Sequence, residues 1–161
     1  MREAIGSTWL IGIVITFVAV FSAFLAYSIS YTKAFRVKNE LINIIEKNEG
    51  FYTSSHNLDN ISDDDLKNDM STEAQIFKYI KSIGYNYAVF DSGKKPCSSM
   101  YTGGYCLEKR CTTGGESART YYKVTTYISL SIPIINVSVN LPISGETKTL
   151  QYDNSALECT K

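Results

Sequence analysis

The stretch WLIGIVITFVAVFSAFLAY, residues 9–27, decides the architecture of this 161-residue chain. Sixteen of its nineteen residues are hydrophobic, and no charged residue occurs between Glu3 and Lys33. A helix rises about 1.5 Å per residue, so this stretch covers the hydrocarbon thickness of a bilayer, which is about 30 Å. The sequence therefore predicts a transmembrane anchor in residues 1–30.

A cleavable signal sequence is the alternative interpretation of this stretch. The triplet Ala26-Tyr27-Ser28 fits the small-x-small pattern of a cleavage site. However, the apolar region exceeds the usual length of about 7–15 residues, and the basic region before it is weak. We therefore expect the anchor to stay attached to the mature protein.

The helical pattern continues beyond the anchor. Neither Gly nor Pro occurs between Gly12 and Gly50, and apolar residues recur at helical spacing on one stripe, namely Ala34, Val37, Leu41, Ile44 and Ile45. We expect residues 31–50 to form a helical stem, with Gly50 at its end. One helix of about forty residues, about 60 Å long, would then lie half in lipid and half outside. A transmembrane helix followed by a separate short helix is the alternative.

Four cysteines follow the anchor, and we expect them to form two disulfides. An even number of cysteines is typical of an extracytoplasmic domain. We expect Cys97 to pair with Cys106 in a local loop, and Cys111 to pair with Cys159 near the C-terminus. Free thiols and zinc are the alternatives, but the spacings lack a C-x2-C pair and the only histidine, His56, lies far upstream. The sequence thus predicts a disulfide-bonded extracytoplasmic domain in residues 51–161.

The charges beside the anchor favour the opposite orientation. Lys33, Arg36 and Lys38 follow the apolar stretch, whereas only Arg2 and the α-amine precede it, offset by Glu3. Positive charges tend to stay in the cytoplasm, which would place the C-terminal domain there. We give the cysteines and the continuing helix more weight.

The remaining sequence predicts an α+β domain in which a second, short helix packs on a small antiparallel sheet. We expect residues 52–70 to form a loop, with a brief helical turn starting at Ser62. Thr72 and Gln75 fit a capping box at the start of the second helix, and Gly84 is expected to end it.

Strands are expected in the second half of the chain. Residues 123–132 and 135–141 alternate apolar and polar side chains, which is typical of a half-buried antiparallel sheet. Further strands are expected at residues 85–91 and 147–152, the latter after a turn at Ser144-Gly145, and residues 94–115 are expected to form a cysteine-bearing loop.

The sequence offers few candidate catalytic or ligand-binding residues. His56 lies in a polar loop, where a solvated imidazole is the default. Asp59, Asp63 and Asp65 lack the glycine and the closing glutamate of a calcium loop. The balance of 16 basic and 16 acidic residues gives no electrostatic footprint for nucleic acid. We expect no enzymatic activity, no cofactor or metal, no small-molecule substrate and no nucleic-acid partner.

The arrangement resembles pilin-like subunits, especially the TadE-like pseudopilins of tight-adherence pilus systems. The resemblance rests on Gly6-Ser7-Thr8 leading into the apolar helix, on the helical stem to Glu49, and on the strand-Pro-strand-turn-strand ending over residues 121–152. It implies a membrane-stored component of a bacterial cell-surface filament or secretion machine, packed through its N-terminal helix. At the processing site, Ile11 stands where that family carries glutamate.

Small residues in the anchor are the candidates for such packing. Ala19, Ala23 and Ala26 lie on one helix face, and Gly12 offers a further point of close approach. The alternative is a passive anchor in which these residues face lipid. We expect a single-pass protein of the cell membrane that contacts the membrane and other subunits of a surface assembly. An anchored adhesion or binding domain that does not polymerise is the alternative.

Overall fold

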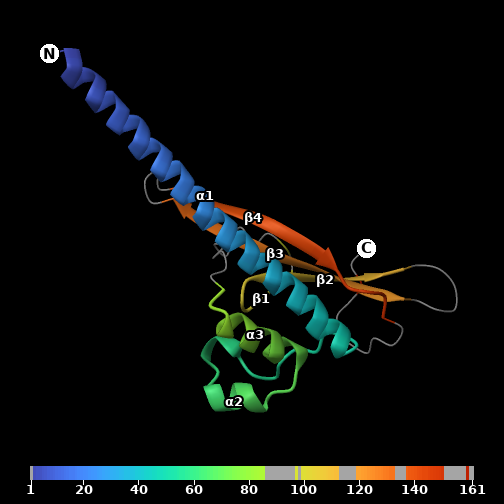
Figure 1. Ribbon diagram of the computed structural model, residues 1–161. Coiled ribbons are helices and arrows are strands. Elements are labelled where there is room, and N and C mark those ends of the chain that lie inside the picture. Colours follow the sequence, from blue (N-terminus) through green and yellow to red (C-terminus); the bar gives the residue numbers. More distant parts are fainter. Residues whose placement is uncertain are drawn as a thin grey trace.

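The computed structural model describes residues 2–85, 97, 99–112, 119–132, 137–150 and 159. Its helices are α1 (Arg2–Lys47), α2 (Asp63–Asn68) and α3 (Thr72–Ser82), with a short 3-10 helix, η1, at Leu58–Asn60. Its strands are β1 (Met100–Tyr101), β2 (Tyr105–Cys111), β3 (Thr120–Ile132) and β4 (Val137–Glu146). The long N-terminal helix and the antiparallel sheet give the α+β class that was expected (Figure 1).

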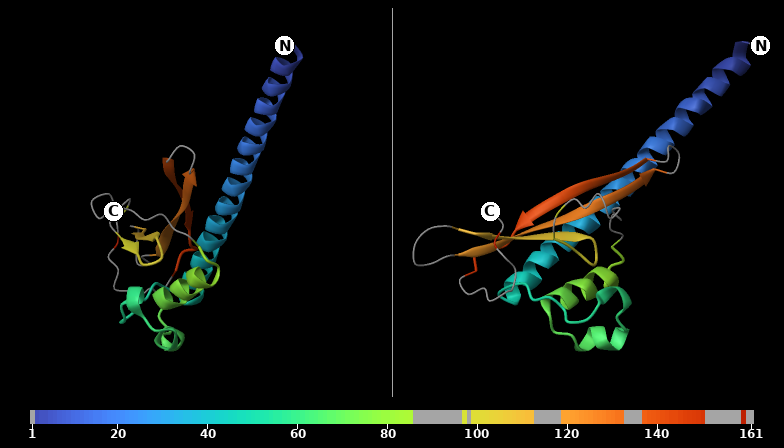
Figure 2. Two further views of the ribbon diagram at one scale, coloured as in Figure 1. Left: turned by 90° about the vertical axis from the view of Figure 1, so that its left-hand side faces the viewer. Right: turned by 180° about the vertical axis from the view of Figure 1, so that it is seen from behind.

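Helix α1 is unbroken over its whole length, so the alternative of two separate helices is not found. Its two halves have different surroundings. Residues 8–27 are exposed, and this half projects away from the rest of the molecule (Figures 1 and 2). In the second half, one stripe is fully buried: Ala34, Val37, Leu41 and Ile45. The first half is apolar on all sides, whereas the second half is apolar along one stripe only. A single apolar stripe is what a helix packed against a sheet needs.

Helix α1 ends three residues before Gly50, the residue that was expected to end it. The last helical residue is Lys47, and Glu49 adopts a left-handed backbone with φ 54°. The amide of Gly50 donates to the carbonyl of Ile45 at 3.1 Å, and that of Glu49 donates to the carbonyl of Glu46 at 3.3 Å. These two bonds form a Schellman motif with Glu49 where glycine is usual.

The strands form one antiparallel sheet in the order β1-β2-β3-β4. The second half of α1 lies across β3 and β4 (Figure 2). The alternation that predicted β3 is found over most of its described side chains: Val124, Thr126 and Ile128 are buried, but so is Tyr127, which was expected on the opposite, polar face. The first three lie on one face because successive side chains of a strand point to opposite sides.

The prediction of a loop over residues 94–115 is wrong, because β1 and β2 lie within it. Strand β2 lies between β1 and β3, and Tyr105, Cys106 and Leu107 are all buried. A strand covered on both faces does not alternate, so the period-two pattern was absent. The glycine pair Gly103-Gly104 forms the tight turn between β1 and β2, with φ 104° and 75°.

The predicted turn at Ser144-Gly145 is also wrong, since both residues belong to β4. Instead, glycine at position 145 allows β4 and α1 to pack closely against each other. A Cβ atom there would lie 2.9 Å from Cδ1 of Ile42 and 3.0 Å from Cδ of Lys38. Of the strand expected at residues 147–152, the structure shows a single bridge between Leu150 and Thr120. Residues 151–152, and residues 86–91 of the other predicted strand, lie outside the described residues, and Tyr85 is not in a strand.

The caps of the short helices follow the sequence with one shift. Ser62 caps α2 as expected, accepting a hydrogen bond from the amide of Asp65. Helix α3 is capped by Ser71 rather than by Thr72, which is the first helical residue and donates to the carbonyl of Gly50 at 3.2 Å. Gly84, with φ 58°, follows the end of α3, as predicted.

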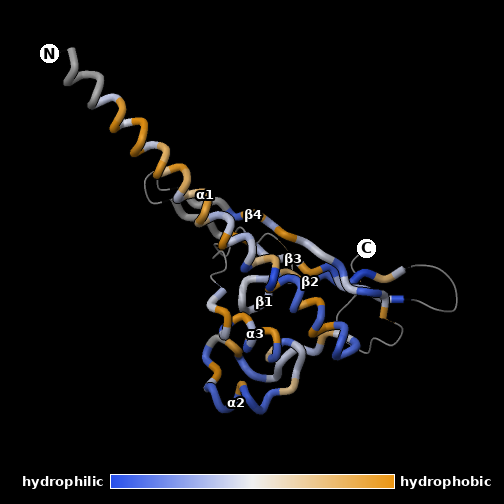
Figure 3. Tube along the Cα trace, viewed as in Figure 1, coloured by the Kyte–Doolittle hydropathy of each residue, from blue (hydrophilic) through white to orange (hydrophobic). Residues whose placement is uncertain are grey.

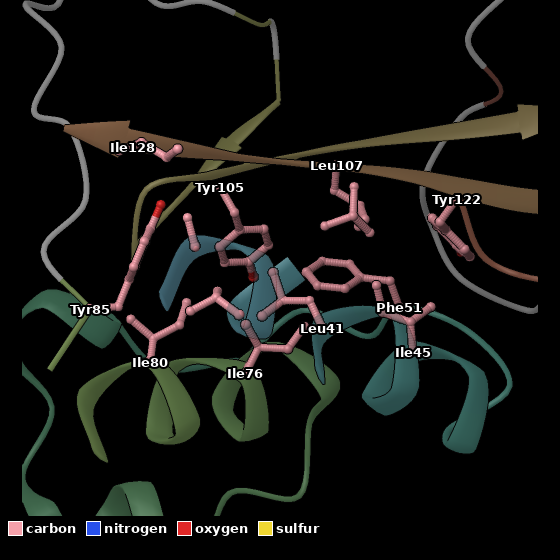
Figure 4. Close-up of a cluster of buried hydrophobic side chains, with 13 residues drawn as sticks. Leu41, Ile45, Phe51, Ile76, Ile80, Tyr85, Tyr105, Leu107, Tyr122 and Ile128 are labelled. Atoms are coloured by element: carbon pink, nitrogen blue, oxygen red, sulfur yellow. The ribbon is translucent and has the colours of Figure 1, made fainter. Parts of the chain in front are cut away.

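The main core joins α1, α3 and the sheet. Figure 4 shows Tyr105 pointing from β2 toward Leu41 of α1 and Ile76 of α3. The ring of Phe51 packs edge-on against Tyr101, with centroids 4.8 Å apart. A smaller cluster joins η1, α2 and α3 through Leu58, Leu66 and Ala74. The core therefore fixes the second half of α1 and leaves the first half uncovered.

Candidate functional site

The exposed half of α1 is the candidate functional site. Large apolar side chains cover it on all sides, with Trp9 75%, Phe17 69% and Val20 65% exposed. Figure 3 shows this half as the longest continuous hydrophobic segment of the trace. Among the described residues, Thr8–Lys47 is the one helix long and apolar enough to cross a membrane, and its most apolar window is not buried at all. A helix of the core would be covered, and this segment is not.

Five hydroxyl groups in and just beyond this half bond within the helix. Each donates to the carbonyl four residues earlier, at 2.8–3.0 Å, and the donors are Thr16, Ser22, Ser28, Ser30 and Thr32. In water these groups could bond to solvent, whereas in hydrocarbon an unsatisfied hydroxyl is costly. The internal bonds let the helix carry its few polar groups into an apolar medium.

Aromatic side chains mark both ends of the apolar stretch. Trp9 lies near its start, and Tyr27, Tyr31 and Phe35 form a ladder at its end, with ring centroids 6.2 and 6.3 Å apart. The ammonium of Lys38 lies 4.3 Å from the centroid of Phe35. Tryptophan and tyrosine favour the membrane–water interface. Sequence reasoning missed this ladder, although the spacing of four residues would have indicated it.

The four small residues singled out from the sequence lie on one face. Ala19, Ala23 and Ala26 follow Gly12 by seven, eleven and fourteen residues, close to whole turns of 3.6 residues. All four are exposed. Gly12 lies in a hollow lined by Thr8, Trp9, Ile13, Thr16, Phe17 and Val20.

This small-residue face continues into the buried stripe of the stem. Ala34, Val37 and Leu41 follow Gly12 by 22, 25 and 29 residues, again close to whole turns. They are fully buried against the domain. The small residues therefore lie on the side of α1 that carries the sheet.

Polar contacts hold the stem to the sheet along its length. The hydroxyl of Thr126 donates to the carbonyl of Ala34 at 3.2 Å. Near the C-terminus of α1, the amide of Lys148 donates to the carboxylate of Glu46 at 2.8 Å, and the two side chains form an ion pair at 3.6 Å. Together with the close approach at Gly145, these contacts fix the direction of α1 relative to the domain.

The four cysteines form the two expected pairs. Cys97 is joined to Cys106, with Cα atoms 6.2 Å apart, and Cys111 to Cys159, with Cα atoms 5.7 Å apart. The first bond lies on the sheet face opposite Tyr105, next to Tyr127. The second closes a loop with a sequence separation of 48, which contributes about 3–4 kcal/mol by restricting the unfolded chain.

Asp69 is a titratable group held by hydrogen bonds in the loop before α3. Asp69 accepts from Ser54 Oγ at 2.5 Å and from the amide of Ser71 at 2.8 Å. Burial raises the pKa of Asp69, but these hydrogen bonds outweigh it and the net pKa is lowered. His56 is exposed and lies 3.8 Å from Asp69. No three His, Cys, Asp or Glu side chains of the described residues lie close enough to share a metal ion.

Tyr85 is a buried group that sequence reasoning missed. Its hydroxyl donates to the carbonyl of Tyr127 and accepts from the amide of the same residue at 3.0 Å. Burial raises the pKa of Tyr85 to about 12. The phenol therefore stays neutral and ties the segment after α3 to β3.

Comparison with protein-family models, with curated proteins and with solved structures finds no match. The class of this protein is therefore defined by its own structure: a disulfide-bonded α+β domain on a helix whose first half is apolar and exposed.

Proposed function

We propose that this protein is a non-enzymatic, single-pass membrane protein that acts as a pilin-like or accessory subunit of a bacterial cell-surface pilus or secretion assembly. The observation that carries the proposal is the continuity of α1, whose exposed small-residue face runs in line with the stripe packed on the sheet. Such a helix can hold its own domain and offer a packing face to a neighbour at the same time.

The membrane location is supported by the chemistry of the exposed half. A monomeric protein in water rarely exposes so large an apolar surface. The hydroxyls that bond within the helix and the aromatic residues at both ends suit a bilayer. We therefore assign residues 8–27 to the membrane.

The disulfides support an extracytoplasmic domain, because such bonds persist in oxidising compartments. Lys33, Arg36 and Lys38 favour the opposite orientation. Peptide mapping under non-reducing conditions, on protein taken directly from membranes, tests this assignment. The two pairs found in the structure are the expected result, and four reduced thiols would contradict an extracytoplasmic location.

Packing between subunits is tested by enlarging the small-residue face. In the double variant Ala19→Leu/Ala23→Leu the span stays hydrophobic, but a neighbouring backbone can no longer approach closely. The control is Val14→Leu/Val18→Leu, which has the same spacing and lies on the opposite side of α1. A photo-crosslinking residue at Val20, beside the small-residue face, reports contact with neighbouring subunits in cells.

We expect the alanine variant to lose the crosslinked species while the valine control keeps it. Membrane insertion and disulfide formation should be normal in both. Equal crosslinking in the two variants, or none in the parent protein, would contradict the assembly function.

The second candidate is an anchored adhesion or binding domain that does not polymerise. It is favoured by a groove of about 760 Å³ between α1 and α3, lined in part by Glu40, Lys47, Lys78 and Tyr79. Mixed charges beside an aromatic ring suit a polar ligand. An absence of crosslinks from α1 in the membrane would support this second candidate over the first.

A further inference from the structure

Strands β3 and β4 share a long region without charge. Lys123 and Glu146 face each other in the ladder, and the sequence between them, residues 124–145, contains no charged residue. We call the two described parts of this region, residues 124–132 and 137–145, the β arm. An uncharged stretch of this length is unusual for a sheet edge in water, where charged side chains normally discourage association.

The β arm points toward the N-terminal half of α1. One of its contacts with the helix is the hydrogen bond from Thr126 to Ala34, near the start of the buried stripe. From there β3 continues six residues to Ile132, which is about 20 Å at 3.3 Å per residue. Strand β3 is inclined to α1 (Figures 1 and 2), so it advances less than this along the helix axis. About thirteen residues of α1, which lead back to residue 21, are therefore the upper limit, and the end of the arm lies near the C-terminal end of the apolar stretch.

The views agree with this estimate. In Figures 1 and 2 the ends of β3 and β4 reach back past the stem and lie at the level of the apolar half of α1. A membrane that surrounds residues 8–27 therefore meets the end of the β arm as well, because the contacts of the stem fix its direction relative to the sheet.

We propose that the end of the β arm lies in the headgroup region of the same membrane that α1 spans, as a second contact with the lipid. The proposal rests on the membrane location of α1 proposed above. It adds that the domain rests on the lipid surface instead of standing away from it on the stem.

The headgroup region is the depth that the backbone permits. Strand β4 lies at the edge of the sheet that the described residues form. On its outer side, backbone N–H and C=O groups are therefore not paired with another strand. Open sheet edges do not occur in hydrocarbon, because such groups need hydrogen-bonding partners. Headgroups and interfacial water supply them, and the uncharged polar residues of the arm, such as Asn140, suit the same environment.

Lipid is favoured over a second protein copy by the position of the arm. The arm lies beside the span itself, and neither Lys123 nor Glu146 at its base has to leave water for the end to reach the headgroups. Charged side chains are the most costly groups to bury in a membrane. Their absence from the arm and their pairing at its base therefore match the boundary between lipid and water.

Depth-dependent quenching of tryptophan fluorescence tests the proposal. The full chain is placed in phosphatidylcholine vesicles whose lipids carry bromines at shallow or deep positions of the acyl chains. Trp9 is the only tryptophan, so the parent protein reports insertion of α1. In a Trp9→Phe background, Val137→Trp reports the end of the arm and Leu141→Trp a position nearer its base. The matched control is Tyr52→Trp, an exposed aromatic position just beyond the far end of α1.

We expect loss of fluorescence with shallow bromines and a blue-shifted emission at positions 137 and 141, with the larger effect at 137, and neither change at position 52. Leu141 is exposed, so its replacement leaves the core intact if Val137→Trp disturbs folding. Intact mass shows whether both disulfides have formed in each variant.

The outcomes separate the two proposals. If Trp9 is quenched while positions 137 and 141 behave like position 52, the β arm does not touch lipid and the inference is overturned, whereas the anchor stands. If Trp9 itself is not quenched, both the membrane anchor and the contact of the arm are overturned. A blue-shifted emission at position 137 without quenching by bromines at either depth would indicate contact between protein copies and would likewise overturn the lipid contact.

Discussion

The hydroxyl of Thr126 on β3 donates a hydrogen bond to the carbonyl oxygen of Ala34 on α1, although the two residues are 92 positions apart in the chain. Both residues are fully buried. The bond lies where the exposed half of α1 gives way to the packed half, so it fixes the point at which the helix leaves the sheet. The direction of the anchor is therefore set by the sheet rather than by the helix alone.

Replacing this threonine tests that relationship. Thr126→Val keeps the shape of the side chain but removes the donor, so we expect a loss of about 0.5–1.5 kcal/mol in the free energy of unfolding. Thermal unfolding of the full chain in detergent measures it. Thr125→Val, on the opposite face of the same strand, is the control and should change stability by less. Equal effects would mean that the bond to Ala34 is not responsible.

Gly145 should not tolerate a larger side chain. The Cβ atom of Gly145→Val would lie within 3 Å of Ile42 Cδ1, so the strand and the helix must move apart. Overpacking of this kind costs about 1–3 kcal/mol. Shortening the neighbour in the double variant Gly145→Val/Ile42→Ala should recover part of the loss relative to the sum of the single variants. Strict additivity in chemical unfolding would argue against the contact.

Glu49 is a position at which glycine should stabilise the protein. Its backbone is left-handed, with φ 54°, which costs energy for every residue with a Cβ atom. We expect Glu49→Gly to gain about 0.5–1 kcal/mol at the Schellman motif. Glu49→Ala removes the same carboxylate but keeps the Cβ atom, so it should bring no such gain. A similar rise of the melting temperature in both variants would assign the effect to the lost charge.

Stability should fall in alkaline solution because of Tyr85. Its pKa is about 12 in the native state against an ordinary value of 10.0. Below pH 10 the phenol is neutral in both states and its contribution is fully present. Between pH 10 and 12 the unfolded phenol loses its proton first, so the free energy of unfolding falls by about 1.4 kcal/mol per pH unit.

The control for this effect is Tyr85→Phe. This variant should be less stable at neutral pH, because it loses both hydrogen bonds to Tyr127, but its stability should decline less steeply above pH 10. Equilibrium unfolding at a series of pH values compares the two slopes. Parallel slopes would show that Tyr85 does not carry the alkaline transition.

The sequence predicted those elements whose pattern is local. Residues 9–27 are apolar without interruption, and residues 124–132 alternate, so the anchor helix and β3 could be recognised from single stretches. Strand β2 could not, because it is covered on both sides and its burial depends on β1 and β3. Gly145 was misread for a similar reason: its role is set by Ile42 and Lys38, which are more than a hundred residues earlier in the chain.

The candidate site divides in the same way. The sequence by itself determined that a long apolar helix with Gly12, Ala19, Ala23 and Ala26 leads into a cysteine-bearing domain, because hydrophobicity and helical spacing are properties of neighbouring residues. The apolar stripe of the stem was also visible in the sequence, whereas tertiary structure alone decided which strands pack on that stripe and where the β arm lies relative to the helix. Those relations depend on contacts between distant segments, such as that of Thr126 with Ala34, and such contacts exist only once the chain has folded.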